Sequence, residues 1–183
     1  MILMSQNSLL DEGRDPELDA WYIEHLTNMS SVPGIFSAQR FKTATAGFPR
    51  TVALYSVVSE RAFDHPFYKK IKGFGVLTPY INEREHHVDL FEGLDAAPIA
   101  DDADRLLLAN RDRPKGPIAG IPFIWLKCVG RDFSTPHRGI AVVSADHVPV
   151  LDDSVAVYRP VTIRFEGSVG DSLGNLSENR DGA

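Results

Sequence analysis

The chain has almost no cysteine and no excess of positive charge, and both shortages exclude functions. Cys128 is the single cysteine among 183 residues, so no disulfide can form within the chain and nothing in it requires an oxidising compartment. Lysine and arginine number 19 against 25 aspartates and glutamates, a formal net charge of -6. A surface that follows nucleic acid phosphates needs clustered cations, so we expect no nucleic acid partner.

Long apolar runs and the common cofactor and hydrolase motifs are also missing. The apolar start Met1 to Met4 passes at once into Ser5, Gln6 and Asn7, which is too short for a membrane span or a signal peptide. We therefore expect a cytoplasmic protein without a membrane partner. No Gly-rich phosphate loop, Gly-x-Ser-x-Gly turn or His-Glu-x-x-His helix occurs, so we expect no cofactor and none of these hydrolase mechanisms.

The clearest element in the sequence is an amphipathic helix over residues 15–32. Its apolar face recurs every three or four positions, which is the helical period, and comprises Leu18, Trp21, Tyr22, His25, Met29 and Val32. Asp15 is suited to the N-cap, with Pro16 at the first helical position. The pair Pro33-Gly34 then ends the helix.

The rest of the first half is typical of strands with one more short helix. β-Branched and aromatic runs with turn residues between them favour strands, which we predict over residues 2–8, 35–43, 50–58 and 86–94, with a helix over 59–71. The order is strand, helix, strand, strand, helix, strand. This order predicts a ferredoxin-like α+β unit over residues 1–95.

The second half, residues 96–166, is rich in strands but less regular. We predict strands over 105–110, 121–129, 139–143 and 155–165, and a short helix over 145–151. A Pro- and Gly-rich stretch stands where a full copy of the first unit needs a helix. The half is therefore a candidate for a degenerate repeat packed on the first, in which Val155-Ala156-Val157-Tyr158 takes the place of Val88-Asp89-Leu90-Phe91. Residues 167–183 are polar and rich in Ser, Gly, Asn and Asp, which predicts a disordered tail.

Four short motifs in the first half follow one another in a distinctive order. They are Trp21-Tyr22-Ile23-Glu24-His25-Leu26, Val32-Pro33-Gly34-Ile35, Ala38-Gln39-Arg40-Phe41 and Ala53-Leu54-Tyr55. This order resembles the EthD-like group of dimeric α+β barrels. The resemblance implies a cavity between helices and sheet, and relatives with varied reactions: lactone isomerases, polyketide cyclases, cofactor-free monooxygenases and haem enzymes. The chain departs from single-unit members through its long second half.

His25 is the first candidate catalytic residue. It lies in the middle of the helical stripe beside Tyr22, so its imidazole should face the sheet. In a cavity there, a histidine is suited to general acid or base catalysis. The alternative is a core histidine whose ring is satisfied by a backbone carbonyl or a hydroxyl.

Arg40 and Tyr55 fall on two adjacent predicted strands. Inward-facing groups of these types can bind an oxyanion or an enolate, such as that of a lactone or a phenol. Their alternative roles are a surface arginine and a packed tyrosine with its hydroxyl in water. We expect Cys128, in an apolar run without a neighbouring base, to be an inert core thiol.

Three further histidines have no assigned role. His87 and Asp89 share one face of a strand and His86 takes the other. Two ligands do not make a metal site, and no recognised spacing supplies a third, so we expect no metal. The group is a solvated strand end or an acid-base pair. His137 lies in a loop with a hydroxyl and an arginine, which is either a site mouth or a turn.

Three functions stay open. The first is a cofactor-independent enzyme, an isomerase, cyclase or lyase, that acts on an apolar or aromatic catabolic intermediate with His25 as proton shuttle. The second is a non-catalytic small-molecule-binding or accessory protein of the EthD-like family, and the third a structural module. A cavity with His25 and a second polar group favours the first, an otherwise apolar cavity the second, and a filled core the third. We expect a homodimer, because an uncovered apolar sheet face needs a partner.

Overall fold

The computed structural model describes residues 1–114 and 116–167. The tail predicted to be disordered, residues 167–183, therefore lies outside the described residues apart from Gly167.

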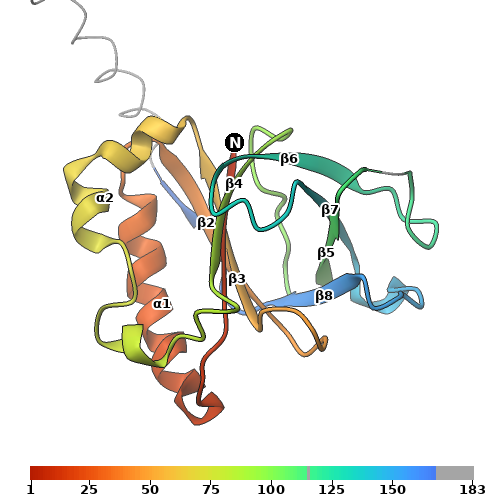
Figure 1. Cartoon of the computed structure of the whole chain (residues 1–183), viewed down its shortest axis with the longest axis horizontal. Helices are drawn as coiled ribbons and strands as arrows, with labels where there is room; N and C mark the ends of the chain where they lie inside the picture. Colours follow the sequence, from red (N-terminus) through yellow and green to blue (C-terminus); the bar gives the residue numbers. More distant parts are fainter. Residues whose placement is uncertain (115, 168–183) are drawn as a thin grey trace, which may run out of the picture.

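Eight antiparallel strands close into one barrel (Figure 1). Around the barrel they follow the order β3-β1-β4-β6-β7-β5-β8-β2, and β2 pairs with β3 to complete the circle. The strands are β1 (Ile2–Asn7), β2 (Ile35–Thr43), β3 (Thr51–Val57), β4 (His87–Glu92), β5 (Asp104–Arg111), β6 (Ile124–Arg131), β7 (His137–Ser144) and β8 (Val155–Pro160). A two-residue strand, β9 (Phe165–Glu166), adds to the edge of β2.

The helices lie on one side of the barrel, at the left in Figure 1. They are α1 (Asp15–Ser30) and the short α2 (Pro66–Ile71), accompanied by three 3-10 turns of the first half, Glu12–Arg14, Glu60–Asp64 and Gly75–Tyr80. A fourth 3-10 turn, Ala145–His147, joins β7 to β8 in the second half. Asp15 is the first helical residue rather than the predicted cap, and Asp11 instead caps the preceding 3-10 turn by accepting from the Gly13 N–H at 2.9 Å. Pro16 lies in the first turn of α1, where its missing N–H costs nothing.

The predicted fold class, a ferredoxin-like α+β unit of the dimeric α+β barrel kind, is wrong. The elements of residues 1–95 follow the predicted order, with the helix predicted over 59–71 divided into the 3-10 turn Glu60–Asp64 and α2. They build a closed β-barrel instead: the edge of β4 pairs with β6 and the edge of β2 pairs with β8. A barrel has no free sheet edge, and here it closes within one chain. The homodimer stays a prediction, but the reason given for it, an uncovered apolar sheet face, does not apply.

The two halves of the barrel share one strand order. In the first half the neighbours are β2-β3-β1-β4, and in the second half they are β6-β7-β5-β8. Each half thus places its second, third, first and fourth strands side by side. A repeat would produce this arrangement, and the repeat stays a prediction. In the described second half the predicted helix over 145–151 is only the 3-10 turn Ala145–His147.

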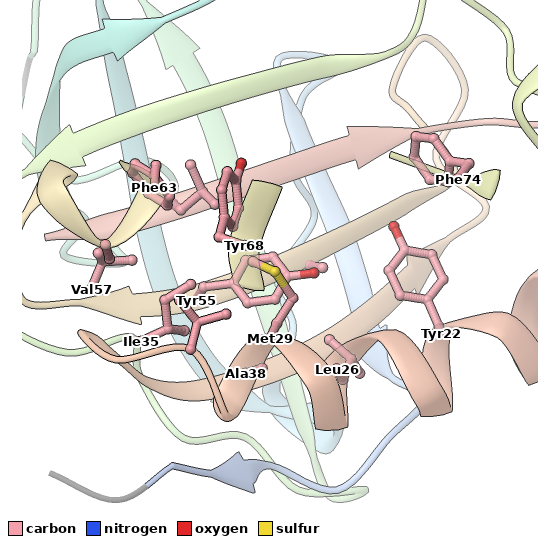
Figure 2. Packing of buried hydrophobic residues seen from close by; sticks show 14 of the residues in the cluster. Tyr22, Leu26, Met29, Ile35, Ala38, Tyr55, Val57, Phe63, Tyr68 and Phe74 are labelled. Carbon is pink, nitrogen blue, oxygen red and sulfur yellow. The ribbon is translucent and has the colours of Figure 1, made fainter. Parts of the chain in front are cut away.

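Apolar side chains fill both the barrel and the space under α1. Along β1, Ile2 and Met4 point into the barrel and Leu3 points outward, as strand alternation requires. The barrel interior also contains Phe41, Val52, Leu54, Phe91, Leu106, Leu108, Leu126, Ile140 and Tyr158. Outside, α1 presents Tyr22, Leu26 and Met29 to Tyr55 and Ala38 of the sheet (Figure 2). The layer under α1 is where the candidate site lies.

Candidate functional site

A small cavity of about 80 Å³ lies between α1 and the outer face of the barrel. Helix, sheet and the segment after α2 all contribute to its walls, which comprise Leu3, Ser5, Trp21, Tyr22, His25, Met29, Tyr55, Tyr68, Lys72, Gly73, Phe74, His86 and Val88. Three of the four residues predicted to carry chemistry, His25, Tyr22 and Tyr55, therefore meet at one place. They stand among aromatic and aliphatic side chains, with a second histidine opposite.

His25 lines this cavity as a neutral imidazole. The ring is half-buried and stacks on Trp21, with 4.3 Å between ring centroids and 18° between planes. Burial lowers the pKa of His25 from 6.5 to about 4, because no nearby anion offsets the loss of water around the charged form. At neutral pH the ring is thus unprotonated, and one of its nitrogens is free to accept a proton.

Tyr55 offers the cavity a hydroxyl that keeps its proton. The side chain is 1% exposed, and no described residue hydrogen-bonds to its hydroxyl. Burial raises the pKa of Tyr55 well above its ordinary value of 10, and the neighbouring Tyr22 and Tyr68 raise it further. The hydroxyl therefore keeps its proton at neutral pH and is a hydrogen-bond donor there.

Tyr22 is held more firmly than Tyr55. Its hydroxyl accepts a hydrogen bond from Asn7 Nδ2 at 2.7 Å. Burial raises the pKa of this phenol too, against the opposing effect of Arg40. Tyr22 and Phe74 face one another above α1 (Figure 2). The fixed hydroxyl makes Tyr22 a wall of the cavity rather than a mobile proton carrier.

His86 is a site residue whose role the sequence left open. Its Nδ1 lies 3.2 Å from the backbone oxygen of Gln6. A carbonyl oxygen only accepts, so Nδ1 carries the hydrogen in this contact and Nε2 is the nitrogen left for a ligand. The edge of this ring meets Phe74, with 5.2 Å between centroids. The available signal was strand alternation, which puts His86 on the face opposite His87.

Arg40, the fourth predicted residue, is not part of the cavity lining. It is 1% exposed and lies under α1, with its guanidinium carbon 4.1 Å from the ring centroid of Tyr22. Its Nη1 donates to Asp19 at 2.6 Å and its Nε donates to Thr51 at 3.1 Å. Arg40 therefore packs on the ring of Tyr22. It does not line the cavity, where the predicted oxyanion ligand would have to lie, and it is buried and so is not a surface arginine.

The remaining candidates lie elsewhere. Asp89 points into the barrel, where it accepts from the Ser134 N–H at 3.0 Å, and no hydrogen bond joins it to His87 among the described residues. His137 Nδ1 contacts the backbone oxygen of Asp112 at 3.1 Å, which is a turn contact. Cys128 is buried, and burial raises the pKa of its thiol. A buried, protonated thiol is a poor nucleophile.

Neither a metal centre nor a membrane helix is found in the described part of the chain. Within residues 1–114 and 116–167, no three His, Cys, Asp or Glu side chains are grouped so that they could hold a metal ion. In the same ranges, no helix has the length and apolar character needed to cross a membrane.

No protein family model, curated protein or solved structure matches the chain. The resemblance to the EthD-like group therefore stays a prediction, and the chemistry of the cavity carries the functional argument.

Proposed function

We propose that the chain is a cofactor-independent enzyme that moves a proton on a small apolar or aromatic carbonyl compound. His25 is the general base and Tyr55 is the hydrogen-bond donor to the oxygen on which charge develops. One observation carries the proposal: a neutral imidazole and a protonated hydroxyl, neither hydrogen-bonded to a described residue, line the same cavity. The proposal includes the cytoplasmic location expected from the sequence.

The reaction follows from these two groups. His25 removes a proton from the carbon next to a carbonyl, which leaves an enolate, and the Tyr55 O–H stabilises the enolate oxygen. Where the substrate also carries a carbon-carbon double bond conjugated with this enolate, the imidazolium returns the same proton to the far carbon of the conjugated system, so the double bond moves and no electron enters or leaves. Isomerisation is the simplest outcome. Attack of the enolate carbon on a second carbonyl of the same molecule gives a cyclisation.

The walls of the cavity suit an apolar substrate. Trp21, Met29 and Phe74 supply aromatic rings and a thioether. Lys72, which is exposed, is the lining residue with a charged side chain at neutral pH. A volume of about 80 Å³ holds a few water molecules, whereas small-molecule pockets measure about 300–1,000 Å³. We infer that substrate entry moves the segment from Lys72 to Gly75. Gly73 and Gly75 both have positive φ there, at 86° and 55°, so the hinge needs glycine.

A second candidate function is binding without turnover. No described residue hydrogen-bonds to the His25 ring, so nothing fixes its tautomer as the third member of a catalytic triad would. In this reading the cavity holds an apolar metabolite and His25 supplies one hydrogen bond. The two candidates differ in a single measurable respect, the transfer of protons between ligand and solvent.

The test is hydrogen exchange on candidate ligands. A panel of small lactones, β-diketones and aryl ketones is incubated with the protein in deuterium oxide, and NMR follows the loss of the proton next to the carbonyl. We expect exchange with the wild type, loss of it in His25→Gln, and a decrease of at least about 100-fold in Tyr55→Phe. His147→Gln, which changes an exposed histidine, is the matched control. Binding of a panel compound without exchange would instead support the second candidate.

A further inference from the structure

Three cations stand side by side on three neighbouring strands. Lys42 of β2 is the direct cross-strand partner of Arg159 of β8. Leu106 of β5 pairs with Tyr158 of β8, so the next position along both strands places Arg105 beside Arg159. Leu106 and Tyr158 point into the barrel, and alternation therefore puts the cations on its outer face. Like charges directly opposite each other destabilise a sheet.

Of these three cations, only Lys42 forms ion pairs with carboxylates of the described residues. Lys42 Nζ lies 3.2 Å from Asp15 and 2.6 Å from Asp19. Arg105 Nη1 donates only to backbone oxygens, those of Asp102 at 3.2 Å and Asp104 at 2.6 Å. Arg159 forms no ion pair and no side-chain hydrogen bond with any residue in the described ranges. Two adjacent guanidinium groups are thus left without a carboxylate.

The row lines a pocket of about 310 Å³. Its walls comprise Asp15, Lys42, Thr43, Ala44, Arg50, Arg105, Val157 and Arg159, which is four cations and one carboxylate. Arg50 comes from the loop between β2 and β3 and pairs with Glu12. No residue lines both this pocket and the cavity of His25. In a chain with net charge -6, such a local excess of positive charge favours a bound anion.

We propose that this pocket binds the phosphate group of a small phosphorylated molecule, between Arg105 and Arg159. The planar guanidinium matches a phosphate with two parallel hydrogen bonds, and two such groups match a dianion. A carboxylate has half that charge and neutralises only one of the two arginines. The pocket is larger than a phosphate ion, which leaves room for the organic part of an ester. The bound phosphate removes the repulsion between the neighbouring arginines.

The proposal is tested with phosphate itself, on the full chain. Isothermal titration measures binding of sodium phosphate, phenyl phosphate and sodium acetate at one ionic strength set with sodium chloride. We expect both phosphates to bind the wild type, phenyl phosphate at least as tightly as phosphate, and acetate more weakly than either. We expect Arg105→Gln/Arg159→Gln to weaken phosphate binding by at least about tenfold.

The matched control removes the same charge elsewhere. Arg61 and Arg84 are exposed and outside the pocket, so Arg61→Gln/Arg84→Gln should bind phosphate as the wild type does. Equal losses in the two double variants, or no phosphate binding by the wild type beyond that of chloride, would overturn the proposal. So would tighter binding of a short DNA duplex that depends on the same two arginines. Thermal melting without phosphate checks folding, and Arg105→Gln/Arg159→Gln should melt no lower than the wild type because like-charge repulsion is relieved.

Discussion

Asp89 Oδ2 and Arg138 Nη2 lie 3.7 Å apart inside the barrel, and each side chain is 1% exposed. Arg138 Nη1 donates to Gln6 Oε1 at 2.6 Å, and Gln6 Nε2 in turn donates to the hydroxyl of Tyr158 at 3.4 Å. Tyr158 donates to the backbone oxygen of Pro49 at 2.7 Å. A chain of polar contacts thus crosses an otherwise apolar interior and links β4, β7, β1 and β8.

Arg138→Met should destabilise the protein by about 3–5 kcal/mol, because it leaves the buried carboxylate of Asp89 without its cation. Adding Asp89→Asn should recover part of this loss. Urea denaturation gives the free energies of unfolding. Lys127→Met breaks an exposed ion pair with Glu92 and should cost less than about 1 kcal/mol. Equal costs for Arg138→Met and Lys127→Met would contradict the view that burial sets the penalty.

The stability of the protein should fall as the pH is lowered from about 7 to about 4, in part through His25. Its pKa is 6.5 when exposed in the unfolded chain and about 4 in the folded protein, so over this range the unfolded chain binds the proton more tightly. The difference corresponds to up to about 3 kcal/mol. It is fully lost below the folded pKa, where both states are protonated.

A variant isolates the His25 contribution from those of the carboxylates, which titrate in the same range. Unfolding free energies of the wild type and His25→Gln are measured at several pH values, and the difference between the two is plotted. We expect this difference to shrink as the pH falls. A difference that stays constant from pH 7 to pH 4 would show that His25 titrates alike in the folded and unfolded chains.

Tyr22→Phe should lower the free energy of unfolding by about 1–3 kcal/mol. The change removes the acceptor of the Asn7 amide, which is fully buried, and an unsatisfied buried donor has a cost of this size. The ring, and with it the contact with Arg40, is kept. Tyr80→Phe alters a half-buried tyrosine and should change stability by less than about 0.5 kcal/mol. Chemical denaturation compares the two, and similar effects would argue against the Asn7 bond.

Local structure was largely predictable from the sequence. The strand predicted over residues 35–43 is β2 with the same bounds, and the helix predicted over 15–32 is α1, which ends at Ser30. Periodicity and turn residues decide such elements, because they act over a few neighbouring positions. The two helices and four strands of the first half appear in the predicted chain order.

Barrel closure was not predictable in the same way. The edges of β2 and β4 pair through backbone groups, which every residue carries, so the sequence does not say which strand an edge meets. One signal was available in β3, whose seven residues are all buried. Its sequence, Thr51-Val52-Ala53-Leu54-Tyr55-Ser56-Val57, is apolar at most positions on both faces, which is typical of a sheet that is covered on both sides.

The candidate site likewise has a part that local sequence predicts and a part that depends on the packing of distant segments. Helical period alone places His25 toward the sheet, and the cavity confirms that orientation. Arg40 belongs to β2, and which residues of α1 lie over it depends on how the helix crosses that strand. In the structure these are Tyr22 and Asp19, so Arg40 does not reach the cavity. Arg105 and Arg159 are far apart in the sequence, so only the register of β5 and β8 reveals that they are neighbours.

The uneven placement of the helices has a consequence for evolution and for engineering. α1 and α2 shield only the first half of the barrel, and in the described residues of the second half the outer apolar surface is instead packed around Phe123, Ile118 and Ile121. One scaffold therefore presents an aromatic cavity and a cationic pocket that are lined by different residues. The two share no lining residue, yet Asp19 of α1 pairs with Lys42 of the cationic pocket and with Arg40 beside Tyr22 of the cavity. One carboxylate therefore links the walls of both sites, and a change of Asp19 alters the two together.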